Sequence, residues 1–162
     1  MPSVLFVCMA NQYRSPLAGA YFCRELDLRA QTREWTVESA GTWAQPDLPA
    51  ALQAQQAALE AGLSLDTHVT RQVSLELLRR FDLILAMEVG QVEAMRTEFP
   101  SMASKIHLLT EVARGISYSI PDPMMSDEGW SQIPAELHQL IQQGFDGIVT
   151  LANTLHKNSL EE

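Results

Sequence analysis

The segment that most constrains this chain lies near its start, where a short apolar run leads directly into a cysteine. The stretch VLFV at residues 4–7 ends at Cys8, and a polar loop then leads to Ser15 and Pro16. An apolar run of this length, followed by turn-forming residues, is typical of a strand buried on both faces. Because serine often caps helices and proline favours their first position, we predict Ser15 as N-cap and Pro16 as first helical residue.

A loop between a strand and the N-terminus of a helix is suited to binding an anion. Its backbone N–H groups and the positive end of the helix can converge on one point. Arg14, six residues after Cys8, adds a planar fork of donors to the same anion. A cysteine beside an arginine at a helix N-terminus is readily ionised. We therefore predict a phosphate-transfer site in which the Cys8 thiolate attacks phosphorus and Arg14 holds the oxygens.

Strand and helix patterns alternate along the rest of the chain. We expect strands near residues 3–7, 35–39, 82–87 and 105–109, and helices near 16–28, 49–62, 74–80, 90–98 and 131–156. The last helix has the clearest pattern, because its apolar residues recur at helical spacing from Trp130 onward. Such alternation favours a parallel sheet covered by helices on both faces. In sheets of this kind ligands bind beyond the carboxyl ends of the strands, where Cys8 lies.

Composition limits the class of protein further. A chain of 162 residues is expected to form a single domain, residues 1–162. The net charge of −9 argues against nucleic acid and anionic membranes as partners. Its two cysteines, Cys8 and Cys23, suit a reducing cytoplasm, and its four scattered histidines argue against a metal site. We expect a cytoplasmic protein that has no metal, no cofactor and no segment that spans a bilayer.

The sequence VCMANQYRSP at residues 7–16 resembles the phosphate loop of the low-molecular-weight protein tyrosine phosphatases. Four further segments resemble that family in the same order, namely ESAGT at 38–42, HVTRQ at 68–72, FDLILAM at 81–87 and IPDP at 120–123. The resemblance extends from about Ser3 to the final helix. It implies a three-layer α/β fold with a four-stranded parallel sheet in the order 2-1-3-4. Helices would cover both faces, and the phosphate-binding loop would follow the first strand.

The resemblance also implies a general acid. An aspartate between two prolines is ordinarily a turn residue, but the family's acid occupies this motif, which assigns the role to Asp122. The predicted catalytic residues are therefore Cys8, Arg14 and Asp122. Ser15 is placed to donate its hydroxyl to the Cys8 sulfur. The loop residues expected to bind or support the phosphate are Met9, Ala10, Asn11, Gln12, Tyr13 and Ser15.

Residues around the loop are expected to support it or to contact the substrate. In the family the loop asparagine has a left-handed backbone and bonds to neighbouring serine and histidine side chains. By resemblance, Ser15, Ser39 and His68 would hold Asn11 here, and asparagine tolerates positive φ. The family's aromatic residues after Asp-Pro are replaced by methionines, and a tryptophan is ordinarily buried. The candidate walls of the substrate groove are Trp43, Met124 and Met125.

The predicted function is hydrolysis of phosphotyrosine monoesters in proteins through a phosphocysteine intermediate. The family commonly has an aliphatic residue or threonine at Gln12 and a second cysteine at Tyr13, and we expect both positions to flank the pocket. A related branch acts on phosphoarginine, where a polar residue at the Gln12 position matters, so a protein arginine phosphatase stays open as an alternative. Glu88 stands where the family usually has aspartate, and the sequence does not reveal the consequence.

The residues argue against two other functions. A non-catalytic module that binds phosphoproteins would need neither the thiolate of Cys8 nor the acid Asp122, so their joint presence disfavours it. An arsenate reductase needs two further cysteines, and the stretch from Thr67 to Met95 contains none. The expected partner is a phosphorylated protein as substrate, with inorganic phosphate or other oxyanions as inhibitors. The chain is expected to be a monomer or a weak dimer.

Overall fold

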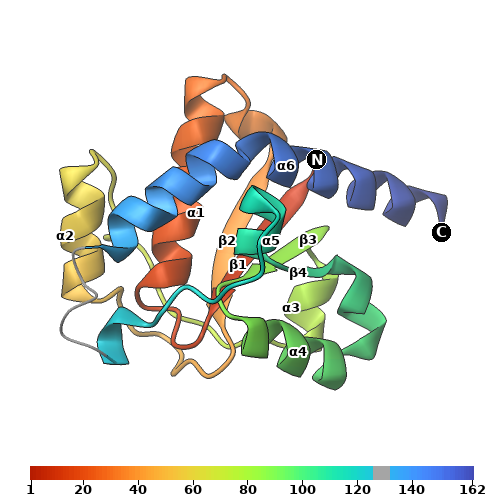
Figure 1. Ribbon diagram of the computed structural model, residues 1–162, viewed down its shortest axis with the longest axis horizontal. Coiled ribbons are helices and arrows are strands. Elements are labelled where there is room, and N and C mark those ends of the chain that lie inside the picture. The colour runs from red at the N-terminus through yellow and green to blue at the C-terminus, as the bar shows by residue number, and fades with distance from the viewer. Residues whose placement is uncertain (126–131) are drawn as a thin grey trace.

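The computed structural model describes residues 1–125 and 132–162 (Figure 1). Its centre is a parallel sheet with the strand order β2-β1-β3-β4, which confirms the predicted order. The strands are β1 (Ser3–Cys8), β2 (Thr36–Gly41), β3 (Leu83–Ala86) and β4 (Ile106–Leu108). Each lies within about two residues of the range expected from the sequence.

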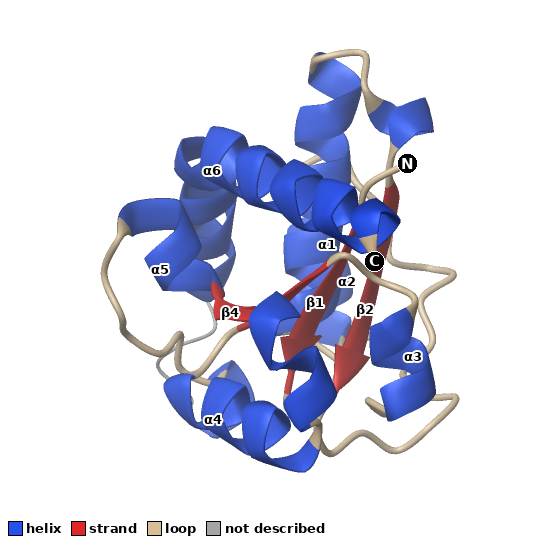
Figure 2. Cartoon of the chain, turned by 90° about the vertical axis from the view of Figure 1, so that its right-hand side faces the viewer, coloured by secondary structure: helices blue, strands red, loops and turns tan. Residues whose placement is uncertain are grey.

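Helices cover both faces of the sheet (Figure 2). One face packs against α1 (Arg14–Leu28), α5 (Leu109–Arg114) and α6 (Ile133–Glu161), and α2 (Leu52–Glu60) packs outside α1. The other face packs against α3 (Leu75–Arg79) and α4 (Val89–Glu98). Short 3-10 helices occupy Thr32–Glu34, Pro100–Lys105 and Pro123–Met125.

The apolar run at the start of the chain explains this arrangement. Successive side chains of a strand point to opposite faces, so Val4 and Phe6 enter one core while Leu5 and Val7 enter the other. All four side chains are completely buried. A strand whose side chains are all apolar is stable only when both faces of its sheet are covered. Within the sheet, β1 lies between β2 and β3. The end of β1 is thereby held in the middle of the sheet.

The predicted helix boundaries needed correction in several places. Helix α1 begins at Arg14 rather than at Pro16, Tyr13 is its N-cap residue, and the Ser15 side chain does not cap it. The hydroxyl of Ser15 instead bonds within the loop, and this contact outweighs the local capping preference. The short helix α5 and the 3-10 helices were not predicted, because single turns carry too few apolar repeats to be recognised.

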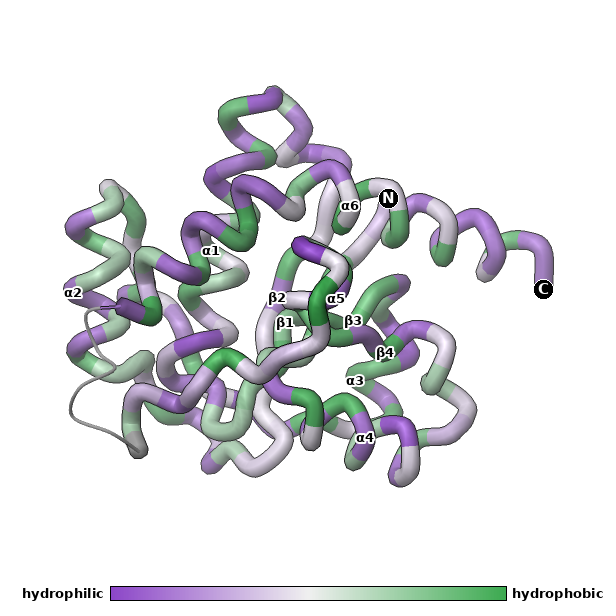
Figure 3. Tube along the Cα trace, in the orientation of Figure 1, coloured by the Kyte–Doolittle hydropathy of each residue, from purple (hydrophilic) through white to green (hydrophobic). Residues whose placement is uncertain are grey.

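Helix α6 follows the predicted amphipathic pattern. It begins at Ile133, has Pro134 in its first turn and runs to Glu161, five residues beyond the predicted end. Trp130 lies outside the described residues. Figure 3 shows hydrophobic and hydrophilic residues alternating along this helix, as its buried face requires. The buried residues are Ile133, Leu137, Leu140, Ile141, Gly144, Phe145, Ile148 and Ala152. Among the described residues, no helix combines the length and apolarity needed to cross a membrane.

Two glycines on helices α4 and α6 allow a test of this packing. A Cβ at Gly144 would lie 2.4 Å from Ala113 Cβ on α5, whereas a Cβ at Gly90 would meet nothing within 4 Å. We predict that Gly144→Ala lowers the free energy of unfolding by about 1–3 kcal/mol through overpacking. Gly90→Ala should raise it by about 0.5–1 kcal/mol because alanine favours the helix. Urea unfolding measures both, and an unchanged midpoint for Gly144→Ala would contradict close contact between α5 and α6.

Candidate active site

The loop predicted to bind phosphate follows β1 directly. Cys8 is the last residue of β1, residues 9–13 form the loop, and Arg14 begins α1. Cys8 pairs in register with Gly41 at the end of β2. The cysteine therefore lies at the carboxyl edge of the sheet, and its side chain is only 2% exposed. This is the edge where parallel α/β sheets bind their ligands.

The Cys8 sulfur has a hydroxyl partner. Cys8 Sγ and Ser15 Oγ are 3.0 Å apart, and both residues are buried. Asn11 Nδ2 donates to Ser15 Oγ at 2.9 Å, so the serine proton is free to point elsewhere. Either atom can donate in this contact, and Ser15 Oγ also lies 3.4 Å from the Ala40 carbonyl oxygen. When Cys8 is a thiolate only Ser15 can donate, and the hydroxyl then stabilises the negative sulfur.

Asn11 turns the loop and is held from three sides. Its φ of 59° lies in the left-handed region, and the residue is completely buried. Besides Ser15, its amide nitrogen donates to Ser39 Oγ at 2.9 Å, and its side-chain oxygen accepts from the Arg71 backbone N–H at 3.1 Å. His68 Nε2 lies 2.7 Å from its backbone carbonyl oxygen. The structure brings together Asn11, Ser15, Ser39 and His68 as the resemblance implied, although His68 contacts the backbone.

Gly41 is a part of the site to which the sequence had assigned no role. A Cβ there would lie 2.4 Å from the Met9 carbonyl oxygen and 3.0 Å from the Asn11 backbone nitrogen. The two residues after Gly41 donate their backbone N–H groups to the carbonyls of Cys8 and Met9, each at 2.9 Å. Glycine lets the backbone of β2 approach the loop this closely. A glycine at the end of a strand was the available signal.

Among the residues that the structure describes, Arg14 is the largest fully buried side chain, at 1% exposure, and three oxygen atoms lie close to its guanidinium. Its Nη1 donates to the Ile120 carbonyl at 2.8 Å and lies 3.1 Å from Glu88 Oε2. Its Nη2 lies 3.5 Å from Asp122 Oδ2. A buried cation is stable only when it is paired, and here the charges come from the segments after β3 and before α6. No role could be assigned to Glu88 from the sequence, although its position two residues after β3 puts it at the same edge of the sheet as Cys8.

Asp122 is oriented by its own loop. Its Oδ1 accepts the Met124 backbone N–H at 2.9 Å, and its Oδ2 faces Arg14. The side chain is 14% exposed, so one face remains accessible to a ligand. The Ile120 backbone N–H donates to the Met87 carbonyl at 2.9 Å and ties this loop to the end of β3. Cys8, Arg14 and Asp122 therefore lie at one end of the sheet.

The two aromatic residues predicted near the loop differ in their exposure. Tyr13 is 3% exposed and packs in the same core cluster as Cys8. Burial raises the pKa of Tyr13 to about 12, which keeps the phenol neutral. Trp43 is 83% exposed and its backbone N–H bonds to the Met9 carbonyl beside the loop, so its side chain is available to the substrate groove as predicted.

The remaining predicted site residues lie around the loop. Met9, Ala10 and Gln12 are half-buried, and Gln12 Nε2 lies 3.4 Å from the Pro49 carbonyl oxygen. Met124 is 47% exposed next to Asp122. The side chain of Met125 lies outside the described part of the chain. Over residues 1–125 and 132–162, no group of three or more metal-ligating side chains could hold a metal ion.

Comparison with known proteins agrees with this geometry. The family model described as "Low molecular weight phosphotyrosine protein phosphatase" matches residues 3–159. A protein-arginine-phosphatase from Bacillus subtilis (strain 168) is 30% identical over 141 residues, which cover 86% of this chain and 92% of the relative. The low molecular weight protein-tyrosine-phosphatase Wzb from Escherichia coli (strain K12) is 37% identical over 121 residues, 75% of this chain and 77% of Wzb.

A solved structure extends the similarity to the fold. A mutant of the arginine phosphatase YwlE with a phosphorylated active site serine superposes with a TM-score of 0.81 at 29% identity. The match covers 99% of both chains. The chain therefore belongs to the low molecular weight phosphotyrosine protein phosphatase family, whose members are cysteine-dependent phosphatases. The resemblance noted in the sequence is confirmed.

The environment of His68 generates a prediction about pH. Burial lowers the pKa of His68, and the nearby Arg71 lowers it further, while the hydrogen bond to Asn11 opposes the shift. His68 is therefore neutral at pH 7 and donates its Nε2–H to the Asn11 carbonyl. Its ordinary pKa in the unfolded chain is about 6.5. Below that pH the unfolded chain takes up the proton first, so this contribution to stability is present at pH 7 and lost as the pH falls.

We predict that His68→Gln reduces the pH dependence of stability. Glutamine has an amide donor but cannot be protonated. The part of the free energy of unfolding that is lost between pH 7 and pH 5 through His68 should therefore not be lost in the variant. Urea unfolding of wild type and variant at both pH values measures the change in free energy of unfolding. If wild type and His68→Gln lose the same amount, His68 is not the group responsible.

Proposed function

We propose that this chain hydrolyses phosphate monoesters on proteins, with phosphotyrosine as the principal substrate. The observation that carries the proposal is the 3.0 Å contact between Cys8 Sγ and Ser15 Oγ at the start of the loop. A serine hydroxyl held toward a buried sulfur is of use to a thiolate and of little use to an inert thiol. Arg14 and Asp122 at the same edge supply the anion donor and the acid that phosphoryl transfer needs.

In the first step of the proposed reaction the Cys8 sulfur attacks phosphorus in line and the bond to the leaving oxygen breaks. Asp122 gives its proton to that oxygen, so the product leaves as a neutral phenol or alcohol. The loop N–H groups and Arg14 hold the equatorial oxygens as their charge grows. The result is a phosphocysteine.

In the second step a water molecule attacks the phosphocysteine and Asp122, now a carboxylate, takes a proton from it. The sulfur–phosphorus bond breaks, and inorganic phosphate and the Cys8 thiolate are released. The Ser15 hydroxyl stabilises the departing thiolate through the hydrogen bond described above. The serine therefore acts on the step in which sulfur is the leaving group.

The partners of Arg14 make its role sensitive to charge. Glu88 and the Ile120 carbonyl fix Nη1, which leaves Nη2 for Asp122 or for a phosphate. A phosphate dianion that enters here displaces the Asp122 carboxylate from Nη2, while Glu88 stays on Nη1.

A protein arginine phosphatase is the second candidate. The half-buried amide of Gln12 puts a polar group in the loop, where an aliphatic residue would suit a phenyl ring. The similarity to a protein-arginine-phosphatase supports this alternative to the same extent as the similarity to Wzb supports the first. We further propose that the partner is a phosphorylated protein, that inorganic phosphate and other oxyanions inhibit, and that the protein acts in the cytoplasm as a monomer or weak dimer.

Matched peptides that carry phosphotyrosine, phosphoserine or phosphoarginine test the substrate. We expect phosphate release with the highest kcat/KM from the phosphotyrosine peptide and none from the Cys8→Ser protein, which should still bind inorganic phosphate. A higher kcat/KM for phosphoarginine would establish the second candidate. Absence of turnover by wild type on all three peptides and on para-nitrophenyl phosphate would favour a non-catalytic phosphoprotein-binding module.

The role of Asp122 is tested by the leaving group. We predict that Asp122→Asn slows hydrolysis of phenyl phosphate by about 10²–10⁴-fold, because a poor leaving group depends on the acid. Hydrolysis of para-nitrophenyl phosphate, a better leaving group, should slow much less. Asp146→Asn, at an exposed position on α6, is the matched control and should leave both rates unchanged. An equal loss on the two substrates would remove Asp122 from the role of general acid.

A further inference from the structure

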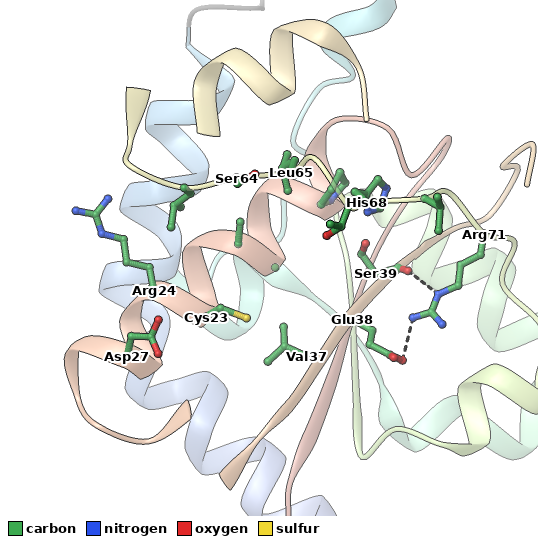
Figure 4. Close-up of a pocket in the computed structure, with 16 residues that line it drawn as sticks. Cys23, Arg24, Asp27, Val37, Glu38, Ser39, Ser64, Leu65, His68 and Arg71 are labelled. Carbon is green, nitrogen blue, oxygen red and sulfur yellow. Dashed lines mark hydrogen bonds and ion pairs between the residues drawn. The ribbon is translucent and has the colours of Figure 1, made fainter. Parts of the chain in front are cut away.

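A cavity of about 630 Å³ lies along the outer edge of β2 (Figure 4). Its floor is residues 37–39 of β2, one wall is α1 with Ala20 and Cys23, and the other wall is the segment 63–69. Cys8, Arg14 and Asp122 do not line it. We call this cavity the β2-edge groove. Its size is within the range of ligand-binding clefts.

The hydrogen-bonding direction of β2 shows which backbone groups face this groove. The backbone N–H groups of Thr36 and Thr42 donate to carbonyls on the β1 side. On the opposite side, the Gly41 N–H donates to the Arg71 carbonyl, and the Gly41 carbonyl accepts from the Val73 N–H. Because the direction alternates along a strand, the even-numbered residues of β2 face β1 and the odd-numbered residues face outward.

Three outward backbone groups of β2 have no partner among the described residues. They are the N–H and the carbonyl of Val37 and the N–H of Ser39. The Ser39 carbonyl accepts from Arg71 Nε at 3.0 Å. The Arg71 side chain therefore already occupies the acceptor that a fifth strand would use next. An exposed strand edge with free donors and acceptors is a template for another extended chain.

The two sides of the β2-edge groove differ in character. Figure 4 shows Val37 pointing toward Cys23 on the α1 side, whereas Glu38 points toward Arg71. Glu38 Oε2 lies 2.9 Å from Arg71 Nη2 and 3.7 Å from Arg80 Nη2. Arg71 and Glu38 line the groove and Arg80 lies beyond its lining, and these three side chains together carry a charge of +1 on a chain whose net charge is −9. An acidic side chain added there completes two ion pairs, whereas a basic one is repelled.

We propose that the β2-edge groove binds an extended peptide segment of another protein as a fifth strand beside β2. The peptide places apolar side chains toward Ala20, Cys23 and Val37, on a side that also includes the opposite charges of Arg24 and Asp27, and acidic side chains toward Arg71 and Arg80. Main-chain hydrogen bonds to Val37 and Ser39 supply the pairing, and the alternate side chains supply the selectivity. A second folded copy does not fit this description, because the edge lies between α1 and segment 63–69, where one extended chain can enter without helices of its own.

A direct binding experiment tests the proposal without using phosphatase activity, so its outcome is independent of the proposed function. The probe is a fluorescent acetylated and amidated peptide Val-Asp-Val-Asp-Val, followed by anisotropy and by ¹⁵N–¹H correlation spectra of the protein. We expect saturable binding that shifts the Val37 and Ser39 amide signals. The charge-inverted peptide Val-Lys-Val-Lys-Val should bind at least about tenfold more weakly. No saturation up to about 1 mM, or shifts confined to other surfaces, would overturn the proposal.

Variants of the groove distinguish the contribution of main-chain hydrogen bonds to peptide binding from the contribution of charge. Val37→Pro removes an outward N–H that the β1 ladder does not use, and should weaken binding about tenfold. Arg80→Glu should weaken binding of the acidic peptide by a similar factor, whereas Arg33→Glu, an equal change of charge at an exposed position on the 3-10 helix Thr32–Glu34, should not. Should Val37→Pro fail to fold, Ala20→Phe fills the α1 side of the groove instead. Affinity unchanged in the folded groove variants would refute strand addition.

Discussion

The left-handed conformation of Asn11 is the constraint on which the rest of the site depends. A loop of five residues can turn from the end of β1 into α1 only if its backbone bends sharply, and Asn11 makes that bend at a φ of 59°. The bend persists because every polar group of the side chain is bonded, to Ser15, Ser39 and the backbone of Arg71. These partners come from α1, β2 and the segment before α3. Three separate parts of the fold therefore maintain one backbone angle.

The second organising feature is the charge balance around Arg14. An acidic chain repels anions at long range, so a phosphate must gain its binding energy at very short range. Arg14 provides this in a buried position, where its attraction for an anion is least screened. Its two carboxylate partners differ in kind, since Glu88 also caps α4 together with Gln91 and is thereby fixed. Asp122 lies on a loop, has the longer contact and is the partner that a ligand can displace.

Much of the fold and of the site could be predicted, because the informative residues are adjacent in sequence. The apolar run before Cys8 indicated a central strand, and the residues from Cys8 to Pro16 indicated the anion site. The errors concern residues whose environment is non-local. Ser15 was expected to cap α1 and instead contacts Cys8 and Asn11, and the side chain of Tyr13 packs into the core cluster. No pattern within a short window reveals either orientation.

The sequence by itself determined the chemistry of the protein, since a thiol, an arginine six residues later and an aspartate between prolines are properties of the covalent chain. It also determined the alternation of strands and helices, because hydrophobic periodicity is local. Only the tertiary structure decided that Glu88 pairs with Arg14, that Gly41 must lack a Cβ and that β2 keeps an unpaired edge. Each of these depends on contact between segments remote along the chain, and such contacts exist only after the sheet has assembled.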